Sequence, residues 1–108
     1  MKKLIAFVLC LLVSFSASAV TETSKTINAM GVQIGSGNSI AYVYVSPAPA
    51  VNCLYGILYI QDLSTPGGTA LLSMLQKAYS LSKPLSRIDY AQDGVSGTCY
   101  ISLIEVAK

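Results

Sequence analysis

The sequence predicts a small domain that is mainly β with one helix and one disulfide, in the order β-β-β-α-β-β. Runs of β-branched and aromatic residues alternate with turn residues, which is typical of short strands. One stretch with helical periodicity lies between the third and fourth of these runs. Two cysteines, Cys53 and Cys99, enclose this central part of the chain.

The first residues have the pattern of a secretory signal peptide. Lys2 and Lys3 precede an apolar run of ten residues, and a segment of small residues then ends in Ala-Ser-Ala at Ala19. The apolar run is shorter than the roughly 20 residues that a membrane-spanning helix needs. We therefore expect a signal peptide over residues 1–19 and a single mature domain over residues 20–108. That domain is expected to be exported, to the periplasm or out of the cell, and to have no membrane span.

The charge balance excludes one class of partner. The whole chain has a formal net charge of +2. Both lysines of the expected signal peptide contribute to it, so the mature domain has five basic and five acidic side chains. Such a domain lacks the basic surface that nucleic-acid binding requires. Near-neutral proteins associate readily, which favours a partner surface or self-association.

The two cysteines of the mature domain are expected to form a disulfide. An oxidising compartment outside the cytoplasm favours pairing of Cys53 with Cys99. Closing the long loop between them would stabilise the domain by roughly 4 kcal/mol on the chain-entropy model. The alternative is a pair of free, buried thiols.

The first half of the domain predicts a hairpin. Residues 20–26 are polar and are expected to be loosely held. Residues 27–34 form a plausible strand in which Gly31 marks a bulge. After turn residues at 35–38, residues 40–45 form a second strand that is rich in β-branched and aromatic side chains.

The second half predicts one strand, the helix and two further strands. The third strand begins near Val51, after a proline-containing loop, and continues to Ile60. Ser64 or Thr65 is expected to cap the helix, with Pro66 at its first position. One helical stripe and a stop at Lys83 and Pro84 define its length, the stripe consisting of Leu71, Leu72, Leu75, Ala78, Tyr79 and Ser82. The last two strands are expected over residues 85–90 and 98–106.

Five strands with a helix between the third and the fourth match a small OB-like barrel, in which a curled sheet closes on itself. An open α+β sheet covered by one helix is the alternative. The barrel is favoured because several strands are apolar on both faces.

Few residues are suited to catalysis. The chain has no histidine, which removes the commonest general base and metal ligand. Its cysteines lack the spacing of a zinc or thioredoxin-like site. Asp62 and Asp93 are expected to stabilise turns. We therefore expect no catalytic residues, metal or cofactor. A hydrolase that uses an unpaired Asp62 or Asp93 is the weakest of the alternatives.

Tyrosines are the best candidates for ligand binding, because each combines a flat apolar ring with a hydroxyl and so suits both sugar faces and protein interfaces. The chain has seven of them. The candidate ligand-binding residues are Tyr42, Tyr44, Tyr90 and Tyr100.

Several segments together resemble a known family. C-L-Y-G-I-L-Y-I, T-P-G-G-T-A, L-L-S-M-L-Q-K-A-Y, R-I-D-Y and G-T-C-Y, in this order, are similar in outline to the binding subunits of AB5 toxins of the subtilase-cytotoxin and pertussis kind, which are small exported OB-fold proteins. The resemblance implies a ring of five subunits with the helix facing a central pore and a glycan on the side of each barrel. It makes the weakly polar side of the helix a candidate subunit contact, namely Ser73, Met74, Gln76 and Ser80.

The sequence thus predicts an exported, non-enzymatic binding module that binds a glycan or a protein and forms a homo-oligomer. The alternative is a small periplasmic inhibitor or immunity-type protein that binds a single protein partner as a monomer.

Overall fold

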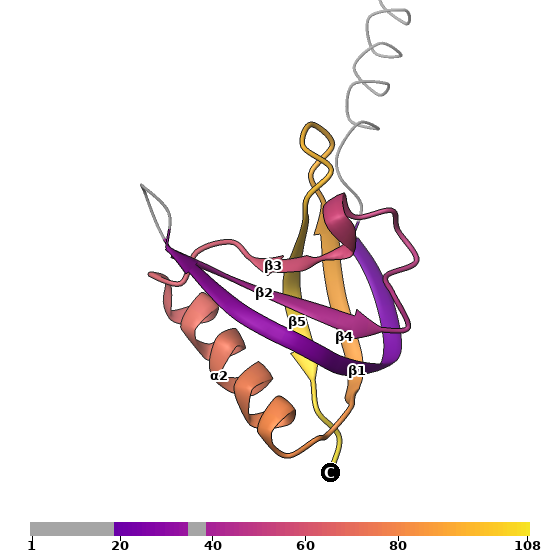
Figure 1. Ribbon diagram of the computed structural model, residues 1–108, viewed down its shortest axis with the longest axis vertical. Helices are drawn as coiled ribbons and strands as arrows, with labels where there is room; N and C mark the ends of the chain where they lie inside the picture. Colours follow the sequence, from indigo (N-terminus) through magenta and orange to yellow (C-terminus); the bar gives the residue numbers. More distant parts are fainter. Residues whose placement is uncertain (1–18, 35–38) are drawn as a thin grey trace, which may run out of the picture.

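Five strands and one long helix make up the described part of the chain, residues 19–34 and 39–108 of a computed structural model (Figure 1). The elements, in chain order, are β1 (Ala19–Ile34), β2 (Ser39–Ser46), a 3-10 turn η1 (Leu54–Gly56), β3 (Leu58–Ile60), α2 (Pro66–Ser80), β4 (Leu85–Gln92) and β5 (Cys99–Glu105). The predicted order and the mainly β character with one helix are confirmed.

The five strands form a ring in the order β1-β2-β3-β5-β4, with β4 paired back to β1. All neighbours are antiparallel except β3 and β5, which are parallel. The long strand β1 closes the ring because its first half pairs with β4 and its second half with β2. The open sheet considered as the alternative is therefore not the arrangement found.

The first strand is longer than predicted. Residues 20–26, expected to be loosely held, pair with β4 along most of their length. Their polar composition is misleading because Lys25 is buried and forms an ion pair with Glu22. The bulge also differs from the prediction, since the register shifts between Ile27 and Ala29 and not at Gly31.

The third strand is much shorter than predicted, with three residues instead of ten. Cys53 lies before the 3-10 turn, and Tyr55 and Gly56 within that turn have φ angles of 60° and 67°. Positive φ angles at two successive residues interrupt an extended chain, so pairing begins only at Leu58.

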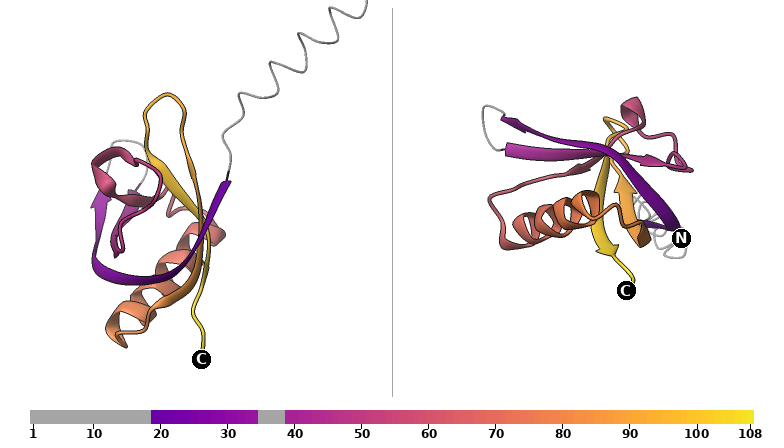
Figure 2. Two further views of the ribbon diagram at one scale, coloured as in Figure 1. Left: turned by 90° about the vertical axis from the view of Figure 1, so that its right-hand side faces the viewer. Right: turned by 60° about the horizontal axis from the view of Figure 1, so that its bottom comes forward.

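The helix α2 begins as predicted. The Thr65 hydroxyl accepts a hydrogen bond of 3.0 Å from the Gly68 N–H, and Pro66 occupies the first turn. It ends at Ser80, before the expected stop, and Ser82 follows with a φ of 54°. The helix lies at the end of the ring away from the turn that joins β4 and β5 (Figures 1 and 2).

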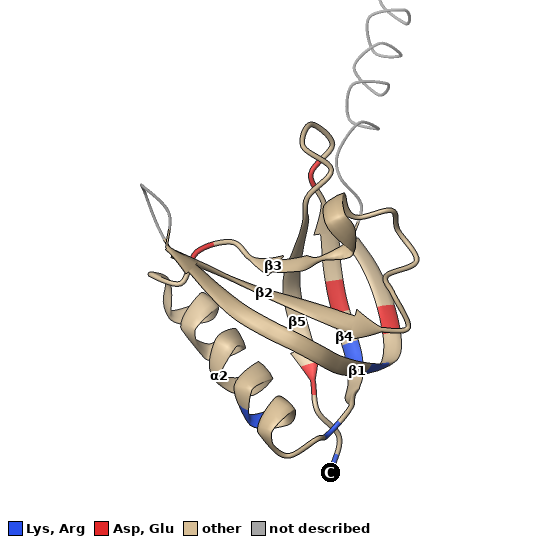
Figure 3. Cartoon of the chain, in the orientation of Figure 1, with Lys and Arg blue, Asp and Glu red and all other residues tan. Residues whose placement is uncertain are grey.

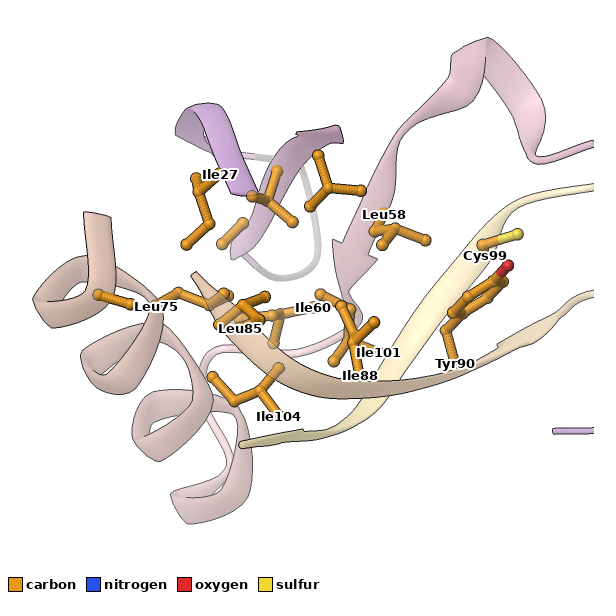
Figure 4. Close-up of a cluster of buried hydrophobic side chains, with 14 of the residues drawn as sticks. Ile27, Leu58, Ile60, Leu75, Leu85, Ile88, Tyr90, Cys99, Ile101 and Ile104 are labelled. Atoms are coloured by element: carbon orange, nitrogen blue, oxygen red, sulfur yellow. The ribbon is translucent and has the colours of Figure 1, made fainter. Parts of the chain in front are cut away.

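The core fills the ring and the space between the ring and α2. Leu75 and Ala78 are the helix side chains buried most completely, whereas Tyr79 of the predicted stripe is exposed. Figure 4 shows Leu75 directed toward Leu85 and the strand residues. The buried cluster also includes alternate residues of the strands, namely Ile27, Ala41, Val43, Val45, Leu58, Ile60, Ile88, Tyr90, Cys99, Ile101 and Ile104.

The predicted disulfide between Cys53 and Cys99 is present, with a Cα–Cα distance of 5.5 Å. It joins the segment before η1 to the first residue of β5. Both cysteines are buried.

Two predictions fall on segments outside the described residues. These are residues 1–18, which carry nearly all of the expected signal peptide, and the expected turn at 35–38. In the parts that are described, no helix has both the length and the apolar character needed to cross a membrane.

Candidate functional site

Tyrosine side chains occupy the outer side of three neighbouring strands. In β2, Ala41, Val43 and Val45 are buried in the core, so Tyr42 and Tyr44 between them point outward. In β3, Leu58 and Ile60 are buried and Tyr59 between them is less buried. In β5, Cys99 and Ile101 are buried and Tyr100 between them is less buried.

The strand register brings these tyrosines into one continuous row. Tyr42 is paired with Tyr59 across β2 and β3, and Tyr59 with Tyr100 across β3 and β5. Ring centroids are 6.1 Å apart for Tyr44 and Tyr42, 6.4 Å for Tyr42 and Tyr59, and 6.5 Å for Tyr59 and Tyr100. These separations lie within the range of favourable aromatic contacts. We call Tyr44, Tyr42, Tyr59 and Tyr100 the tyrosine row.

A glycine on β1 lets the row extend over the next strand. Gly31 is the register partner of Tyr42. A Cβ atom at Gly31 would lie 2.5 Å from the end of the Tyr42 ring, which is too close for any side chain. The Tyr42 ring therefore lies against the bare backbone of β1.

A cleft of about 380 Å³ lies beside the row. It is lined by Gln33, Ile40, Tyr59, Gln61, Thr98 and Tyr100. Two of these residues belong to the row, and the others contribute two amides, one hydroxyl and one aliphatic wall. The lining is polar without being charged.

Basic side chains lie away from the row and the cleft. Figure 3 shows no Lys or Arg on β2, β3 or β5. Arg87 on β4 is paired with Asp89 at 3.0 Å. Burial raises the pKa of the Tyr59 phenol, and the neighbouring phenols act in the same direction. The Tyr59 phenol is therefore uncharged at neutral pH.

Tyr90 does not belong to this surface, and the prediction that it is available to a ligand is wrong. Its exposed fraction is 0% because it points into the core from β4 (Figure 4). Its hydroxyl donates a hydrogen bond to the Glu22 carboxylate and accepts one from the Val51 N–H. Burial raises the pKa of Tyr90 to about 12, and the bond to Glu22 adds to that rise.

Tyr90 is part of a polar network that holds the loop between β2 and η1. The Lys25 ammonium lies 2.7 Å from Glu22 Oε1 and donates to the Pro47 carbonyl oxygen at 2.9 Å. The Ala50 N–H donates to Glu22 Oε2 at 3.0 Å. These contacts hold the loop against β1 and β4 and so stabilise the fold.

Tyr59 was missed as a candidate, although a signal for it was present. The run Leu58-Tyr59-Ile60 alternates apolar, amphipathic and apolar residues, which places Tyr59 on the face opposite to its neighbours. Assigning a ten-residue strand apolar on both faces concealed this alternation.

The predicted subunit-contact residues Ser73, Met74, Gln76 and Ser80 are all exposed on α2. Within this set, two residues border different hollows. Met74 borders a hollow near the C-terminal end of the chain, whereas Gln76 borders another beside Met30 and Val32 of β1.

Asp62 and Asp93 form turns, as expected. Asp62 Oδ1 accepts hydrogen bonds from the hydroxyl and the N–H of Ser64, which lower the pKa of its carboxyl. The Val95 N–H and the Ser96 hydroxyl lower the pKa of Asp93 in the same way. In residues 19–34 and 39–108, no three acidic or cysteine side chains gather as a metal site.

Comparisons of the chain with protein-family models, with curated proteins and with solved structures found no match. The function must therefore be argued from the residues themselves.

Proposed function

We propose that the chain is an exported, non-enzymatic binding module with an OB-like barrel that binds a glycan through the tyrosine row. One observation carries the proposal. Four tyrosines on the outer side of β2, β3 and β5 form a continuous aromatic surface beside an uncharged polar cleft.

The order of the elements supports the OB-like part of the proposal. A ring of five strands in the order β1-β2-β3-β5-β4, with its helix between β3 and β4, agrees with a small Greek-key barrel. OB-folds bind oligonucleotides and oligosaccharides on the face formed by their second and third strands. In this chain the second and third strands are β2, which carries Tyr42 and Tyr44, and β3, which carries Tyr59.

The absence of basic residues from β2, β3 and β5 favours a saccharide over a nucleic acid. Proteins that bind single strands combine aromatic rings with a positively charged groove that follows the phosphates. Here the rings are present without that groove. A tyrosine ring can cover the apolar C–H face of a sugar while its hydroxyl contacts the sugar hydroxyls.

Self-association is part of the same proposal, and fewer observations support it than support glycan binding. The exposed side of α2 carries Ser73, Met74, Gln76 and Ser80, and a near-neutral domain has little charge repulsion against a second copy. The resemblance to toxin binding subunits gives the ring of five as the assembly to test. Native mass spectrometry of residues 20–108 measures the number of subunits directly.

A glycan array tests the binding proposal. We expect residues 20–108 to bind at least one glycan, and a Tyr42→Ala, Tyr59→Ala double variant to bind it roughly tenfold or more weakly. Tyr55→Ala is a matched control, because Tyr55 is 77% exposed and lies outside the row. An array on which the folded protein binds no glycan contradicts the proposal.

A single protein partner is the second candidate, favoured by an apolar patch at the opposite end of the molecule from α2. Val95 in the β4–β5 turn is 97% exposed. It lies near η1, because the Leu54 N–H donates to the Gly97 carbonyl oxygen at 2.9 Å. A monomer that retains a protein partner, loses it on Val95→Asp and binds no glycan would select this function over the first.

A further inference from the structure

Assuming that the tyrosine row binds a glycan, we infer that its ligand is a neutral chain of pyranose sugars with equatorial hydroxyls. The uncharged cleft holds one sugar of that chain, and the row holds the sugars that follow. The inference identifies the class of glycan and the order of its subsites, so it can fail while the proposed function stands.

Neutrality follows from the charges around the site. A carboxylate or sulfate that leaves water needs a cation or several directed donors in return. None of the six residues lining the cleft is charged at neutral pH. Among the described bases, Lys25 and Arg87 are held in ion pairs with acidic side chains, and the remaining three line a different hollow at the end of α2, namely Lys77, Lys83 and Lys108. An anionic sugar would therefore enter the cleft without a cation to pair with.

The cleft has the polar groups that suit sugar hydroxyls. Gln33 and Thr98 contribute an amide and a hydroxyl, which both donate and accept hydrogen bonds, and the Thr98 hydroxyl also accepts one from Ser96 at 3.0 Å. A pair of neighbouring hydroxyls on a sugar also donates and accepts, so the two sets are complementary. Tyr59, Tyr100 and Ile40 supply the flat and aliphatic walls for the C–H groups.

The row indicates a ligand longer than one sugar. Tyr59 and Tyr100 line the cleft, and Tyr42 and Tyr44 continue from them toward the far end of β2. When every hydroxyl of a pyranose is equatorial, the axial C–H groups make both of its faces apolar. A chain of such sugars can contact successive rings, and its affinity should rise with length until the row is covered.

Two oligosaccharides of equal length test the inference. Residues 20–108 are titrated with cellohexaose, which is neutral, and with hyaluronan hexasaccharide, in which alternate sugars carry a carboxylate. We expect cellohexaose to bind roughly tenfold or more tightly than the hyaluronan fragment, and more tightly than cellotriose or glucose. Gln33→Ala and Tyr100→Ala should each weaken cellohexaose binding by several fold. Tyr55→Ala should leave it unchanged.

Folding and function are separated by further measurements. Tyr100→Phe keeps the ring and serves as the second variant if Tyr100→Ala does not fold. If the hyaluronan fragment binds as tightly as cellohexaose or more tightly, the inference that the ligand is neutral is wrong. If glucose alone binds as tightly as cellohexaose, the inference that the ligand is a chain of sugars is wrong. Binding on the array only of neutral glycans whose sugars carry an axial hydroxyl, such as mannose or galactose chains, overturns the equatorial requirement. In these three cases the proposed function stands. An array on which the protein binds no glycan contradicts both the proposed function and this inference.

Discussion

Tyr42 illustrates how one missing side chain shapes the candidate site. The end of its ring lies over Gly31, where even a Cβ atom would be 2.5 Å away. Gly31 has no positive φ angle, so its backbone conformation is open to any residue. The glycine is required for space and not for conformation.

Gly31→Ala should therefore displace the Tyr42 ring while the fold persists. We expect glycan binding to weaken by several fold, with a loss of stability of roughly 1–2 kcal/mol from overpacking. Thermal melting and binding titrations measure the two effects. Gly67→Ala is the control, because nothing lies within 4 Å of a Cβ at Gly67. Unchanged binding by Gly31→Ala would show that the position of Tyr42 does not matter.

Glu22 is the residue through which the fold should respond to acid. Burial alone raises the pKa of its carboxyl, but hydrogen bonds from Lys25, Tyr90 and Ala50 more than offset this and bring the pKa below 4.5. A group whose pKa is lower in the folded state contributes its full stability above its unfolded pKa. That contribution is lost as the pH falls below about 4.5 and through the folded pKa.

Glu22→Gln should remove this dependence. At pH 7 we expect the variant to be roughly 2–3 kcal/mol less stable, because Lys25 stays buried without its carboxylate. The difference from the unmodified protein should shrink as the pH falls below 4.5. Denaturant unfolding between pH 3 and pH 7 measures it, and Glu105→Gln, at an exposed position of β5, is the control. A difference that does not vary with pH would contradict the role given to Glu22.

Elements with strong local signals were predicted well from the sequence. The helix start depends on Thr65 and Pro66, which act within one turn, and the structure has both in place. The strands β2 and β4 have enough β-branched and aromatic residues to be recognised by themselves. The predicted hairpin of β1 and β2 is present, and the elements follow one another in the predicted order.

The elements that were predicted wrongly depend on distant partners. The first half of β1 is polar, and it is a strand because β4 pairs with it and Lys25 forms an ion pair with Glu22. The short β3 results from the positive φ angles of Tyr55 and Gly56, which no residue pattern around them requires. The side on which a tyrosine lies depends on this register. The candidates Tyr42, Tyr44 and Tyr100 therefore lie on the outer side of the ring, whereas Tyr90 is buried and Tyr59 was not among the candidates.

For the molecule as a whole, the shortest junction in the ring is the one between β3 and β5. These strands are paired at only two positions, Leu58 with Cys99 and Tyr59 with Tyr100. The disulfide from Cys53 to Cys99 begins at the first of those pairs and closes a separation of 46 residues. It therefore holds together the part of the ring that carries two members of the tyrosine row.

Removal of the disulfide should affect the site as well as the fold. We expect a Cys53→Ala, Cys99→Ala double variant to lose roughly 2–5 kcal/mol of stability, as small exported domains commonly do. Because the bond reinforces the β3–β5 junction, glycan binding should fall even at temperatures well below the melting point. The loss should match that of Tyr100→Ala, which acts at the same junction. In the intact protein, alkylating reagent should label neither cysteine until reductant is added. A double variant that melts earlier but binds glycan normally would show that β3 and β5 hold their register without the bond.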